Sequence, residues 1–467
     1  MQHSGRIHHG MCVAVVGLGV TGRAAVRYCQ KLGAKVVVSD SRGPERFRAE
    51  SADFLDQTGV EWEAGGHTMP FLQQADCIVV SPGVPQNHPV IVGLQAQGKT
   101  VVGELAVVAP LLEMPVVAVT GTNGKTTVTS LIGEIVRCAG RRVFVGGNIG
   151  TPVFDLLDQG DLPEVVVLEV SSFQLLLAGA FRPDIGVLLN ITPDHLNRHG
   201  SLADYAEAKM RLFHNQRQSD SAILSADDPE CARHRGEVTG RCLTFGGAAD
   251  CTARIDGTKI WTGDDCGTFC YDLAGTAMAN GIGVGNAAAA ILACRTLGIA
   301  PEVILRAIAA FRPGPHRIEE VGELAGIRFV NDSKATNTGA VIAALAQLQG
   351  KAVLIAGGQD KGDDFRLLRP LVQQKVKEAI LLGAAGEQLA EALRGTTTLH
   401  TAPTLEDAVR LGYRLASPGD TVLLSPACAS FDMFESYGHR GTVFRQAVLR
   451  LIADETVATE VDDEPRS

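Results

Sequence analysis

This chain of 467 residues lacks the features that mark membrane-spanning, secreted and nucleic-acid-binding proteins. It has no uninterrupted apolar run of the roughly 18 residues that a membrane-spanning helix needs. No apolar segment typical of a signal peptide precedes the first hydrophobic run, so we expect a cytoplasmic protein. No run of lysine and arginine is longer than a pair, and the formal net charge is −10, which argues against nucleic acid as the main partner.

The cysteines show neither a disulfide pattern nor a metal-binding pattern. There are eleven of them, scattered and without a repeated C-x-x-C spacing. An odd number in a cytoplasmic protein indicates reduced thiols. The closest group, Cys251, Cys266 and Cys270, has no convincing fourth ligand, so we expect no metal site there.

The hydrophobic content of 45% is that of an ordinary soluble globular protein, and the length predicts two or three domains. Apolar runs such as "CVAVVG", "VVAVTG" and "AVLIAGG" alternate with helix-like stretches in three series. Continuous apolar strands with helices between them indicate parallel sheets covered on both faces, so the expected fold class is α/β with three domains. The acidic segment after Ala453 is expected to be a frayed end.

Two breaks in the pattern place the domain boundaries. The first lies near Gly103, before the helix-like "ELAVVAPLLE", and the second lies in "FRPGPHR", where prolines and a glycine interrupt a helical pattern. The predicted domains are therefore 1–103, 104–312 and 313–467.

The stretch "VAVVGLGVTGR" carries the glycine spacing Gly17-x-Gly19-x-x-Gly22 after a buried strand. Such a turn points the N-terminal amides of the next helix at a phosphate, and Asp40 follows at about the distance of a ribose-binding carboxylate. The motif alone is weak evidence. A glycine turn that only lets a strand and a helix pack closely explains it as well.

The strongest single motif is "VVAVTGTNGKTT", residues 116–127. A buried strand enters a glycine loop, and Lys125 and Thr126 stand at the start of the next helix, where lysine neutralises phosphate charge and a hydroxyl binds Mg²⁺. The spacing departs from the usual pattern because Val119 occupies the first glycine position. The lysine, the hydroxyl and the strand-to-helix context nevertheless favour phosphate binding.

Polar side chains follow the next strands. Glu169 ends "VVVLE", at the sheet edge where ligands of α/β proteins gather, and a carboxylate there either holds Mg²⁺ or caps a helix. Asp194, His195 and His199 follow "LLNITP", and His195 is the most credible ligand for a metal or substrate among them. Lys209 falls on a helix-like segment that begins near Ser201, and its composition alone predicts a surface lysine.

Charged residues also gather where the third domain begins. His316, Arg317, Asp332 and Lys334 could bind an anion when domains close, or form a solvated rim. Further on, Lys361 follows a strand and a glycine turn. The segment "SPACASFDMFESYGHRG" follows the last strong strand, where a second substrate would lie.

Together these residues resemble a known family. The segments GTNGKTT, LEVSSFQL, LNITPDHLNRH, GPHR, NDSKATN and SPACASFD are similar to those of the ATP-dependent Mur ligases of bacterial peptidoglycan synthesis. The matches run in order from Gly17 to about Arg440. GLGVTG and SPACASFD together resemble the branch that acts on UDP-N-acetylmuramoyl-L-alanine and D-glutamate.

The resemblance implies a Rossmann-like N-terminal domain for the UDP substrate, a central P-loop ATPase-like domain and a Rossmann-like C-terminal domain that brings the amino acid. ATP would phosphorylate the L-alanyl carboxylate, and the amine of D-glutamate would attack the acyl phosphate. Two Mg²⁺ ions and a carbamylated Lys209 would take part, so the resemblance overrides the surface-lysine interpretation. We expect a monomer without a membrane span or a nucleic-acid partner.

The resemblance also assigns roles residue by residue. The catalytic set is Lys125, His195 and Lys209, and the metal set is Thr126, Glu169, His195 and Lys209. ATP-binding residues are Gly121, Thr122, Asn123, Gly124, Lys125, Thr126, Thr127, Asn286, Arg317, Asp332 and Lys334, with His316 beside them. UDP-substrate residues are Val20, Thr21, Asp40, Ser41, Arg42, Gly83, Asn148, Ser171 and His195. D-glutamate residues are Thr336, Lys361, Ser430, Phe431 and Tyr437. Phe431 and Tyr437 depart from the leucine and phenylalanine that are commoner in the family, which leaves the pocket shape open.

Three alternatives remain at this point. A sister Mur ligase or a folylpolyglutamate synthetase would use a different amino acid, although SPACASFD and Lys361 favour D-glutamate. An NAD-dependent oxidoreductase built on the first glycine turn would bind nicotinamide and need no ATP. A non-catalytic nucleotide-binding module would bind ATP without turnover.

Overall fold

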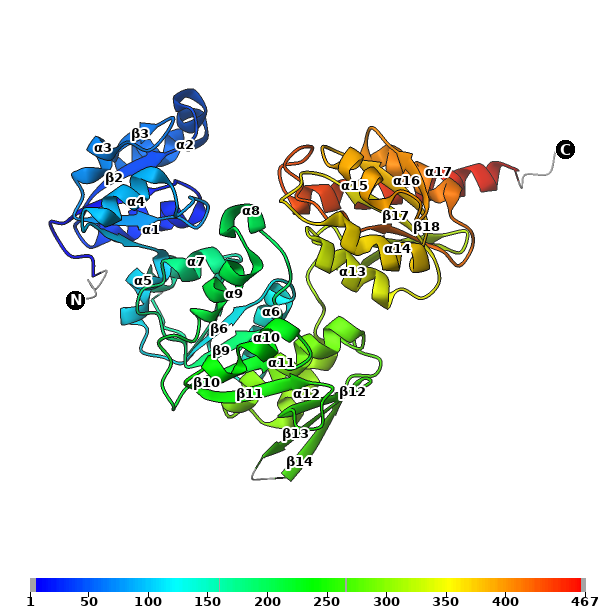
Figure 1. The fold of residues 1–467 in the computed structure, drawn as a ribbon, viewed down its shortest axis with the longest axis horizontal. Helices are drawn as coiled ribbons and strands as arrows, with labels where there is room; N and C mark the ends of the chain where they lie inside the picture. The colour runs from blue at the N-terminus through cyan, green and yellow to red at the C-terminus, as the bar shows by residue number, and fades with distance from the viewer. Residues whose placement is uncertain (1–5, 159, 265–266, 463–467) are drawn as a thin grey trace. The chain divides into compact units, whose positions relative to one another are not determined.

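The structure is a computed structural model that describes residues 6–158, 160–264 and 267–462 (Figure 1). The chain forms two compact units. The first comprises Met1–Ile191, Ala203–Ala279 and Gly283–Phe311, and the second comprises Thr192–Leu202, Asn280–Ile282 and Arg312–Ser467. Within the described ranges, no helix combines the length and the apolar character needed to cross a membrane. Cys266, part of the cysteine group considered above, lies outside the described residues.

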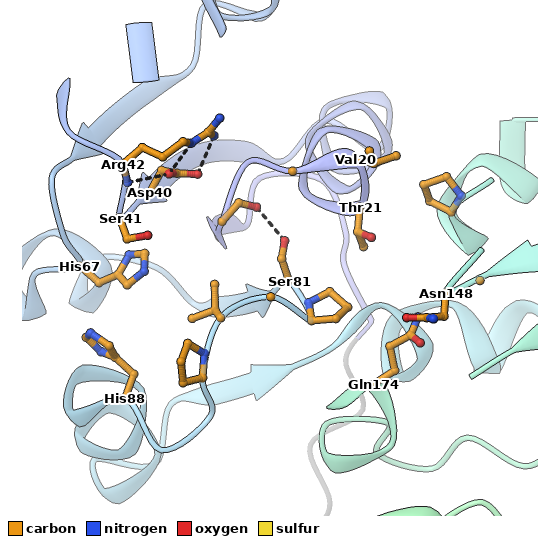
Figure 2. Close-up of a pocket in the computed structure, with 18 of the residues that line it drawn as sticks. Val20, Thr21, Asp40, Ser41, Arg42, His67, Ser81, His88, Asn148 and Gln174 are labelled. Atoms are coloured by element: carbon orange, nitrogen blue, oxygen red, sulfur yellow. Dashed lines mark hydrogen bonds and ion pairs between the residues drawn. The ribbon is translucent and has the colours of Figure 1, made fainter. Parts of the chain in front are cut away.

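A five-stranded parallel sheet forms the N-terminal part of the first unit. Its strand order is β3-β2-β1-β4-β5. The strands are β1 (Cys12–Val16), β2 (Lys35–Asp40), β3 (Glu61–Ala64), β4 (Cys77–Val80) and β5 (Thr100–Val102), and the helices are α1 (Val20–Lys31), α2 (Pro44–Thr58), α3 (Met69–Gln73) and α4 (Pro89–Ala96). The order reverses between β1 and β4, so a crevice opens at the carboxyl ends of these strands, as α/β sheets place their ligands (Figure 2).

The rest of the first unit is built on a nine-stranded sheet of order β14-β13-β12-β11-β10-β9-β6-β8-β7. Its strands are β6 (Val116–Thr120), β7 (Val143–Gly147), β8 (Val165–Glu169), β9 (Ile185–Leu188), β10 (Ser221–Ser225), β11 (Arg241–Gly246), β12 (Ala253–Asp256), β13 (Lys259–Asp264) and β14 (Gly267–Asp272). The helices are α5 (Glu104–Val108), α6 (Lys125–Cys138), α7 (Ser172–Leu176), α9 (Leu202–Met210), α10 (Pro229–Arg233), α11 (Gly281–Thr296) and α12 (Pro301–Ala310).

This sheet departs from the expected parallel arrangement at one end. Strands β12, β13 and β14 pair antiparallel. Only Gly257 and Thr258 separate β12 from β13, and Gly257 adopts a φ of +60°. So short a turn can join only antiparallel strands, because a parallel pair needs a crossover of a dozen or more residues.

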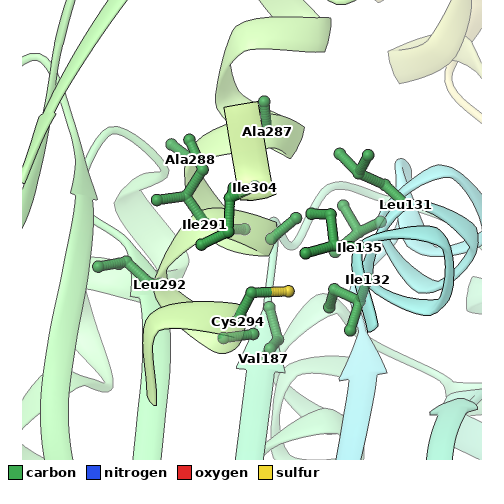
Figure 3. Close-up of a cluster of buried hydrophobic side chains, with 14 of the residues drawn as sticks. Leu131, Ile132, Ile135, Val187, Ala287, Ala288, Ile291, Leu292, Cys294 and Ile304 are labelled. Carbon is green, nitrogen blue, oxygen red and sulfur yellow. The ribbon is translucent and has the colours of Figure 1, made fainter. Parts of the chain in front are cut away.

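The helices of this second sheet are stabilised by the apolar core that they share with its strands. Apolar residues of α6, α11 and α12, among them Leu131, Ile135, Ile291 and Ile304, pack with strand residues such as Val187, and all are buried (Figure 3). The strands that lead to the functional loops are thus held in a close-packed interior, which fixes where their carboxyl ends lie.

The second unit contains a six-stranded sheet of order β15-β16-β20-β17-β18-β19. Its strands are β15 (Glu319–Leu324), β16 (Ile327–Asn331), β17 (Ala352–Gly357), β18 (Val376–Leu382), β19 (Thr398–Thr401) and β20 (Thr421–Leu424), and its helices are α8 (Leu196–His199), α13 (Thr338–Gln347), α14 (Arg369–Lys375), α15 (Gly386–Leu393), α16 (Leu405–Leu415) and α17 (Tyr437–Asp462). Only β15 pairs antiparallel. Helices α13, α14 and α15 share one core, while α16 and α17 share another, so both faces of the sheet are covered.

The expected frayed end after Ala453 is also wrong over most of its length, because α17 continues to Asp462. The helix starts from a well-anchored segment, in which Phe444 and Val448 are fully buried. No glycine or proline stands between Gly441 and Pro465 to interrupt it.

Candidate functional site

A pocket of about 600 Å³ occupies the crevice at the switch point of the first sheet. It collects Val20, Thr21, Asp40, Ser41, Arg42, Gly83 and Asn148, all predicted from the sequence to meet the UDP substrate. It also includes His67, His88 and Gln174, which sequence reasoning did not select. Figure 2 shows the two histidines at one end, beside Ser41, and Asn148 with Gln174 at the other.

The glycine turn in this pocket meets the packing requirement considered above. A Cβ atom at Gly22 would collide with the carbonyl oxygen of Gly17, so close packing of strand and helix requires glycine there. Gly17 itself has a φ of +88°, and its carbonyl accepts a 2.7 Å hydrogen bond from Ser81 Oγ. Helix α1 begins directly after the turn, at Val20, and presents its free amides to the pocket.

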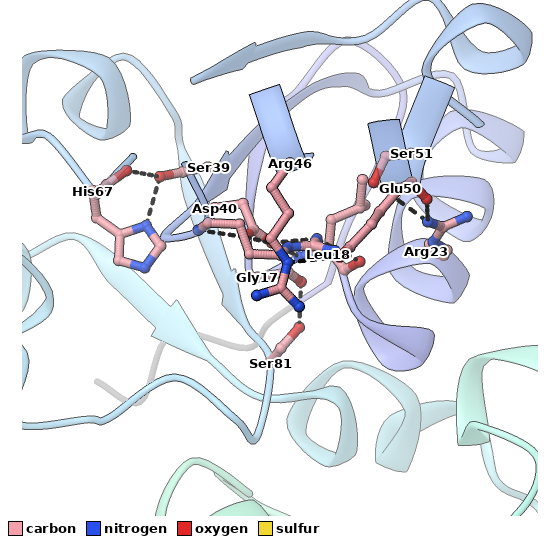
Figure 4. Close-up of polar contacts among 12 residues, drawn as sticks. Gly17, Leu18, Arg23, Ser39, Asp40, Arg46, Glu50, Ser51, His67 and Ser81 are labelled. Atoms are coloured by element: carbon pink, nitrogen blue, oxygen red, sulfur yellow. Dashed lines mark hydrogen bonds and ion pairs between the residues drawn. The ribbon is translucent and has the colours of Figure 1, made fainter. Parts of the chain in front are cut away.

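Asp40 fixes this turn rather than projecting freely. Its Oδ2 accepts a hydrogen bond from the Leu18 amide at 2.7 Å (Figure 4). Oδ2 also accepts from Arg42 Nη2 at 2.8 Å, and Oδ1 accepts from Arg42 Nε at 2.8 Å (Figure 2). Burial would raise the pKa of Asp40, but the hydrogen bonds from Arg42 and Leu18 outweigh burial and lower it to about 2. The carboxylate is therefore ionised and holds the Arg42 guanidinium over the turn.

The other end of the pocket leads toward the second sheet. Asn148 follows β7, and its Nδ2 donates to Glu169 Oε1 at 2.8 Å. Ser171 does not line the pocket; it caps α7 and forms a capping box with Gln174, which does. Sequence reasoning therefore selected Ser171, which orients Gln174, and missed Gln174, which lines the pocket.

The loop that the sequence predicts to bind phosphate lies between β6 and α6, as expected. Gly124 caps α6 with a φ of +86°, and a Cβ atom there would lie 2.5 Å from Asn286 Oδ1. Lys125 Nζ folds back to the carbonyls of Gly121, at 2.9 Å, and Thr122, at 2.7 Å. This places the ammonium group against the loop whose amides would bind phosphate.

Asn190, missed by sequence reasoning, is hydrogen-bonded to this loop at three points. Its Oδ1 accepts from the amides of Thr122 at 3.1 Å and Asn123 at 2.8 Å, and its Nδ2 donates to Asn123 O at 3.0 Å. Its position just after β9, in "LLNIT", is the only sequence signal that could have indicated it.

Two residues of the predicted metal set, Glu169 and Lys209, lie near this loop. Glu169 is 2% exposed, and its Oε2 is buried with no hydrogen-bond partner among the described residues. Lys209 is 1% exposed rather than on the surface, and its Nζ donates to Gly121 O at 2.7 Å. The described residues contain no cluster of three or more His, Cys, Asp or Glu that could hold a metal ion by themselves. His195 belongs to the segment Thr192–Leu202 of the second unit.

Within the second unit, Lys361 is already paired. Its Nζ lies 2.6 Å from Asp194 Oδ1, and Asn337 Nδ2 donates to Asp194 Oδ2 at 3.1 Å. Burial would raise the pKa of Asp194, but the positive charge of Lys361 and the hydrogen bonds lower it. The next residue, His195, adopts the left-handed conformation with a φ of +56°, which is uncommon for a residue with a side chain.

Among the charged residues at the start of the second unit, Asp332 belongs to a buried group of side chains and not to a solvated rim. Asp332 is buried, accepts from Ser425 Oγ at 3.0 Å and has a pKa raised to about 7 by burial. The His316 ring contacts Asn331 Nδ2 at 3.0 Å, and His316 has a φ of +64°. Lys334 Nζ lies 3.8 Å from the centre of the Tyr437 ring, so residues assigned to the nucleotide and to D-glutamate meet here.

Arg440 organises the loop that carries Ser430, and sequence reasoning missed it. This arginine is 2% exposed and donates to Cys428 O at 3.1 Å, to Ser333 Oγ at 3.0 Å and to Ser333 O at 2.8 Å. Ser430 beside it is buried, whereas Phe431 is 71% exposed. No sequence signal distinguishes Arg440 from the other arginines of α17.

Three protein-family models match successive parts of the chain. The model of the Mur ligase MurD-like N-terminal domain matches residues 11–103. The Mur ligase middle domain matches residues 119–294, and the Mur ligase glutamate ligase domain matches residues 316–428.

Curated relatives are similar over nearly the full length. A UDP-N-acetylmuramoylalanine--D-glutamate ligase of Desulfotalea psychrophila is 50% identical, covering 94% of this chain and 96% of the relative. A protein of the same name from Acidobacterium capsulatum is 42% identical over the same shares of both chains.

Solved structures support the fold. The MurC UDP-N-acetylmuramate-alanine ligase of Thermotoga maritima has a TM-score of 0.58 at 19% identity, covering 94% of this chain and 99% of that one. The MurF ligase of Thermotoga maritima, solved with ADP, has a TM-score of 0.59 at 20% identity, covering 96% and 97%.

Proposed function

This chain belongs to the Mur ligase family, and on that premise we propose that it is an ATP-dependent ligase that joins D-glutamate to UDP-N-acetylmuramoyl-L-alanine in peptidoglycan precursor synthesis. The observation that carries the proposal is the 50% identity, over almost the whole of both chains, to a relative that bears this activity in its name. The expected three-domain α/β architecture is confirmed by the three family models and the structural neighbours.

The chemistry accounts for the need for ATP. A carboxylate is a poor acyl donor because its oxygen is a poor leaving group. Transfer of the γ-phosphoryl group from ATP to the L-alanyl carboxylate gives an acyl phosphate and ADP. The amine of D-glutamate then attacks the carbonyl carbon, the amide bond forms, phosphate leaves and the amine loses a proton.

The loop at Lys125 would bind the ATP phosphates. The amides of Gly124, Lys125, Thr126 and Thr127 stand at the start of α6, where backbone donors and the helix dipole favour anions. Gly121, Thr122 and Asn123 would form the rest of the ATP-binding loop, with the amides of Thr122 and Asn123 held by Asn190. Lys125 Nζ would leave the loop carbonyls to contact the transferring phosphoryl group, where its charge stabilises the negative charge of the transition state. Asn286, next to Gly124, would contact the nucleotide.

The residues around this loop fit a magnesium ion. The buried, unpaired Oε2 of Glu169 is an oxygen that lacks a cation or a donor, and the Thr126 hydroxyl belongs to the first turn of α6. When bound, Mg²⁺ would supply charge that offsets the phosphate oxygens and positions them for transfer. Glu169 and Thr126 would hold one ion, and His195 with a carbamylated Lys209 would hold a second. Lys209 is already buried beside Gly121, where a carbamate would replace a cation with an anion.

The two other substrates would be held by residues of the first and of the second unit, respectively. The pocket at the first sheet would take the UDP-linked substrate, with the diphosphate at the amides of Val20 and Thr21 and the muramoyl part toward Asn148. Thr336, Lys361, Ser430, Phe431 and Tyr437 would hold D-glutamate, and a substrate carboxylate would compete with Asp194 for Lys361. Arg317, Asp332 and Lys334 would complete the nucleotide site. The domain limits 1–103, 104–312 and 313–467, the cytoplasmic location and the monomeric state remain predictions.

Release of phosphate tests the proposal. The purified full chain is incubated with ATP, Mg²⁺, UDP-N-acetylmuramoyl-L-alanine and each member of a panel of amino acids. We expect turnover with D-glutamate alone. Strong turnover with L-alanine or meso-diaminopimelate would assign a sister ligase, turnover with a folate and glutamate would assign a folylpolyglutamate synthetase, and ATP binding without turnover would indicate a binding module.

A further inference from the structure

Two histidines at one end of the first pocket form a pair with opposite hydrogen-bonding character. His67 follows β3 and His88 caps α4, and both line the pocket. Their rings meet edge to face, with centroids 5.2 Å apart and an interplanar angle of 78°. Neither residue belongs to the set assigned to the substrate above.

The tautomer of His67 follows from its partners. Ser39 Oγ lies 2.7 Å from Glu63 Oε1 and 2.7 Å from His67 Nδ1. Glu63 also accepts from the amide of Thr68 at 2.9 Å and from its hydroxyl at 2.6 Å, so both of its oxygens act as acceptors. The single hydroxyl proton of Ser39 therefore goes to Glu63, and Ser39 Oγ accepts the proton of His67 Nδ1. Figure 4 shows this connection between Ser39 and His67.

The other nitrogen of His67 is consequently an acceptor. Burial and the neighbouring His88 lower the pKa of His67, so the ring is neutral near pH 7. A neutral imidazole carries one proton, and Nδ1 holds it, so Nε2 keeps a lone pair.

His88 has the opposite arrangement. Its Nδ1 accepts a hydrogen bond from the amide of Val90 at 3.3 Å, as the cap of α4. In the neutral ring the proton must then sit on Nε2, which becomes a donor. In the described part of the chain, neither Nε2 atom has a hydrogen-bond partner.

The order of groups in the substrate decides which of them meets this pair. This step rests on the proposed function, in which the diphosphate lies at the glycine turn and the acyl group lies toward Asn148, which contacts Glu169. Base, ribose, diphosphate and sugar are joined in a line, so the base must lie at the opposite end. Figure 2 shows that this end holds His67 and His88.

We propose that His67 and His88 select uracil by reading its imide edge. His67 Nε2 accepts the N3–H of the base, and His88 Nε2–H donates to the adjacent O4 carbonyl oxygen. Cytosine presents the reverse pattern. Its N3 lone pair would face the lone pair of His67, and its amino group would face the proton of His88, so both contacts would be lost. A site built to bond one polar pattern rejects the mismatched one strongly, since its own groups are left unpaired.

Calorimetric binding of UDP, CDP and 3-methyluridine diphosphate to the full chain tests this proposal. We expect UDP to bind about tenfold or more tightly than either analogue. His67→Phe keeps a ring of similar size but removes the acceptor, so it should weaken UDP about tenfold, leave CDP nearly unchanged and bring the ratio of affinities close to one. His67→Gln should keep UDP binding within a few-fold, because its amide oxygen can accept, yet admit CDP.

A matched control is His214→Phe, which changes an exposed histidine outside the pocket and should leave all affinities unchanged. Binding of ADP and the melting temperature show that each variant is folded. Equal binding of UDP and CDP by the unaltered protein, or an unchanged ratio in His67→Phe, would overturn the proposal. If this happens while D-glutamate still supports phosphate release, only the base-reading role fails. If UDP selectivity is seen without turnover on D-glutamate, the proposed ligase function fails instead.

Discussion

Arg440 offers the most direct test of how the second unit builds the loop around Ser430. The guanidinium uses three nitrogens: Nε donates to Ser333 Oγ, Nη1 to Cys428 O and Nη2 to Ser333 O. Burial lowers the pKa of Arg440 to about 10, so the side chain is still charged near pH 7. Lysine has one nitrogen and cannot occupy three positions, so Arg440→Lys leaves at least two buried acceptors without a donor.

The size of the effect follows from those two acceptors. Each buried acceptor that loses its donor costs about 1–3 kcal/mol, so we expect Arg440→Lys to destabilise the loop by about 2–6 kcal/mol. Arg440→Met should cost at least as much, since it removes every donor. Because 1.4 kcal/mol is a factor of ten, even about 2 kcal/mol corresponds to a roughly thirtyfold increase in local opening.

Hydrogen exchange of the loop measures this opening directly. Amides of residues 427–434 should exchange about thirtyfold or more faster in Arg440→Lys. Under the proposed function the loop would position D-glutamate without reacting, so the KM for D-glutamate should rise more than kcat falls. Arg450→Lys, an exposed arginine on the same helix, is the control and should behave as the unaltered chain. Normal exchange and a normal KM in Arg440→Lys would refute the reasoning.

Three further predictions concern the first unit. Lys209→Ala should abolish most turnover, with partial recovery in short added carboxylates that would stand in for the proposed carbamate; unchanged activity in bicarbonate-free buffer would contradict that role. Glu169→Gln should raise the Mg²⁺ concentration needed for half-maximal phosphate release about tenfold or more, and an unaltered Mg²⁺ titration would show that Oε2 faces no metal. Burial raises the pKa of Glu104 from 4.5 to about 7, so its contribution to stability is present below pH 4.5 and is lost as the pH rises through 7. Glu104→Gln should therefore stabilise the chain by up to about 3 kcal/mol at pH 8 but little at pH 4.5, and equal gains in urea unfolding at both pH values would argue against this account.

The sequence predicted those parts of the fold that depend on local pattern. Apolar runs such as Val116–Thr120 became buried strands, and helix α6 begins at Lys125 as the glycine loop indicated. The antiparallel strands β13 and β14 were missed, because Lys259–Asp264 carries too little apolar alternation to stand out from a loop. The pairing of β13 with β12 depends on the tight turn at Gly257, so it follows from tertiary structure rather than from a strong local propensity.

The candidate site shows more clearly what could not be predicted from the sequence. Asp40 was found from its spacing after the glycine turn, yet spacing could not show that Leu18 and Arg42 occupy its oxygens. His67 and Gln174 line the pocket because of where β3 ends and where α7 begins, and neither position carries a motif. Residue type and spacing predict which chemistry is available, whereas the direction of each hydrogen bond depends on partners brought together by the fold.

The internal partners of two lysines, Lys125 and Lys361, explain how a chain of net charge −10 can bind anions. An unpaired cation in a partly buried site is costly, and both key lysines avoid that cost here. Lys125 rests on the carbonyls of Gly121 and Thr122, and Lys361 rests on Asp194. Under the proposed function, a phosphate or a substrate carboxylate must displace these internal acceptors. Binding is therefore an exchange of partners, so Lys361→Met should cost less stability in a chain that also carries Asp194→Asn than in one that keeps Asp194, because the double variant leaves no buried charge unpaired.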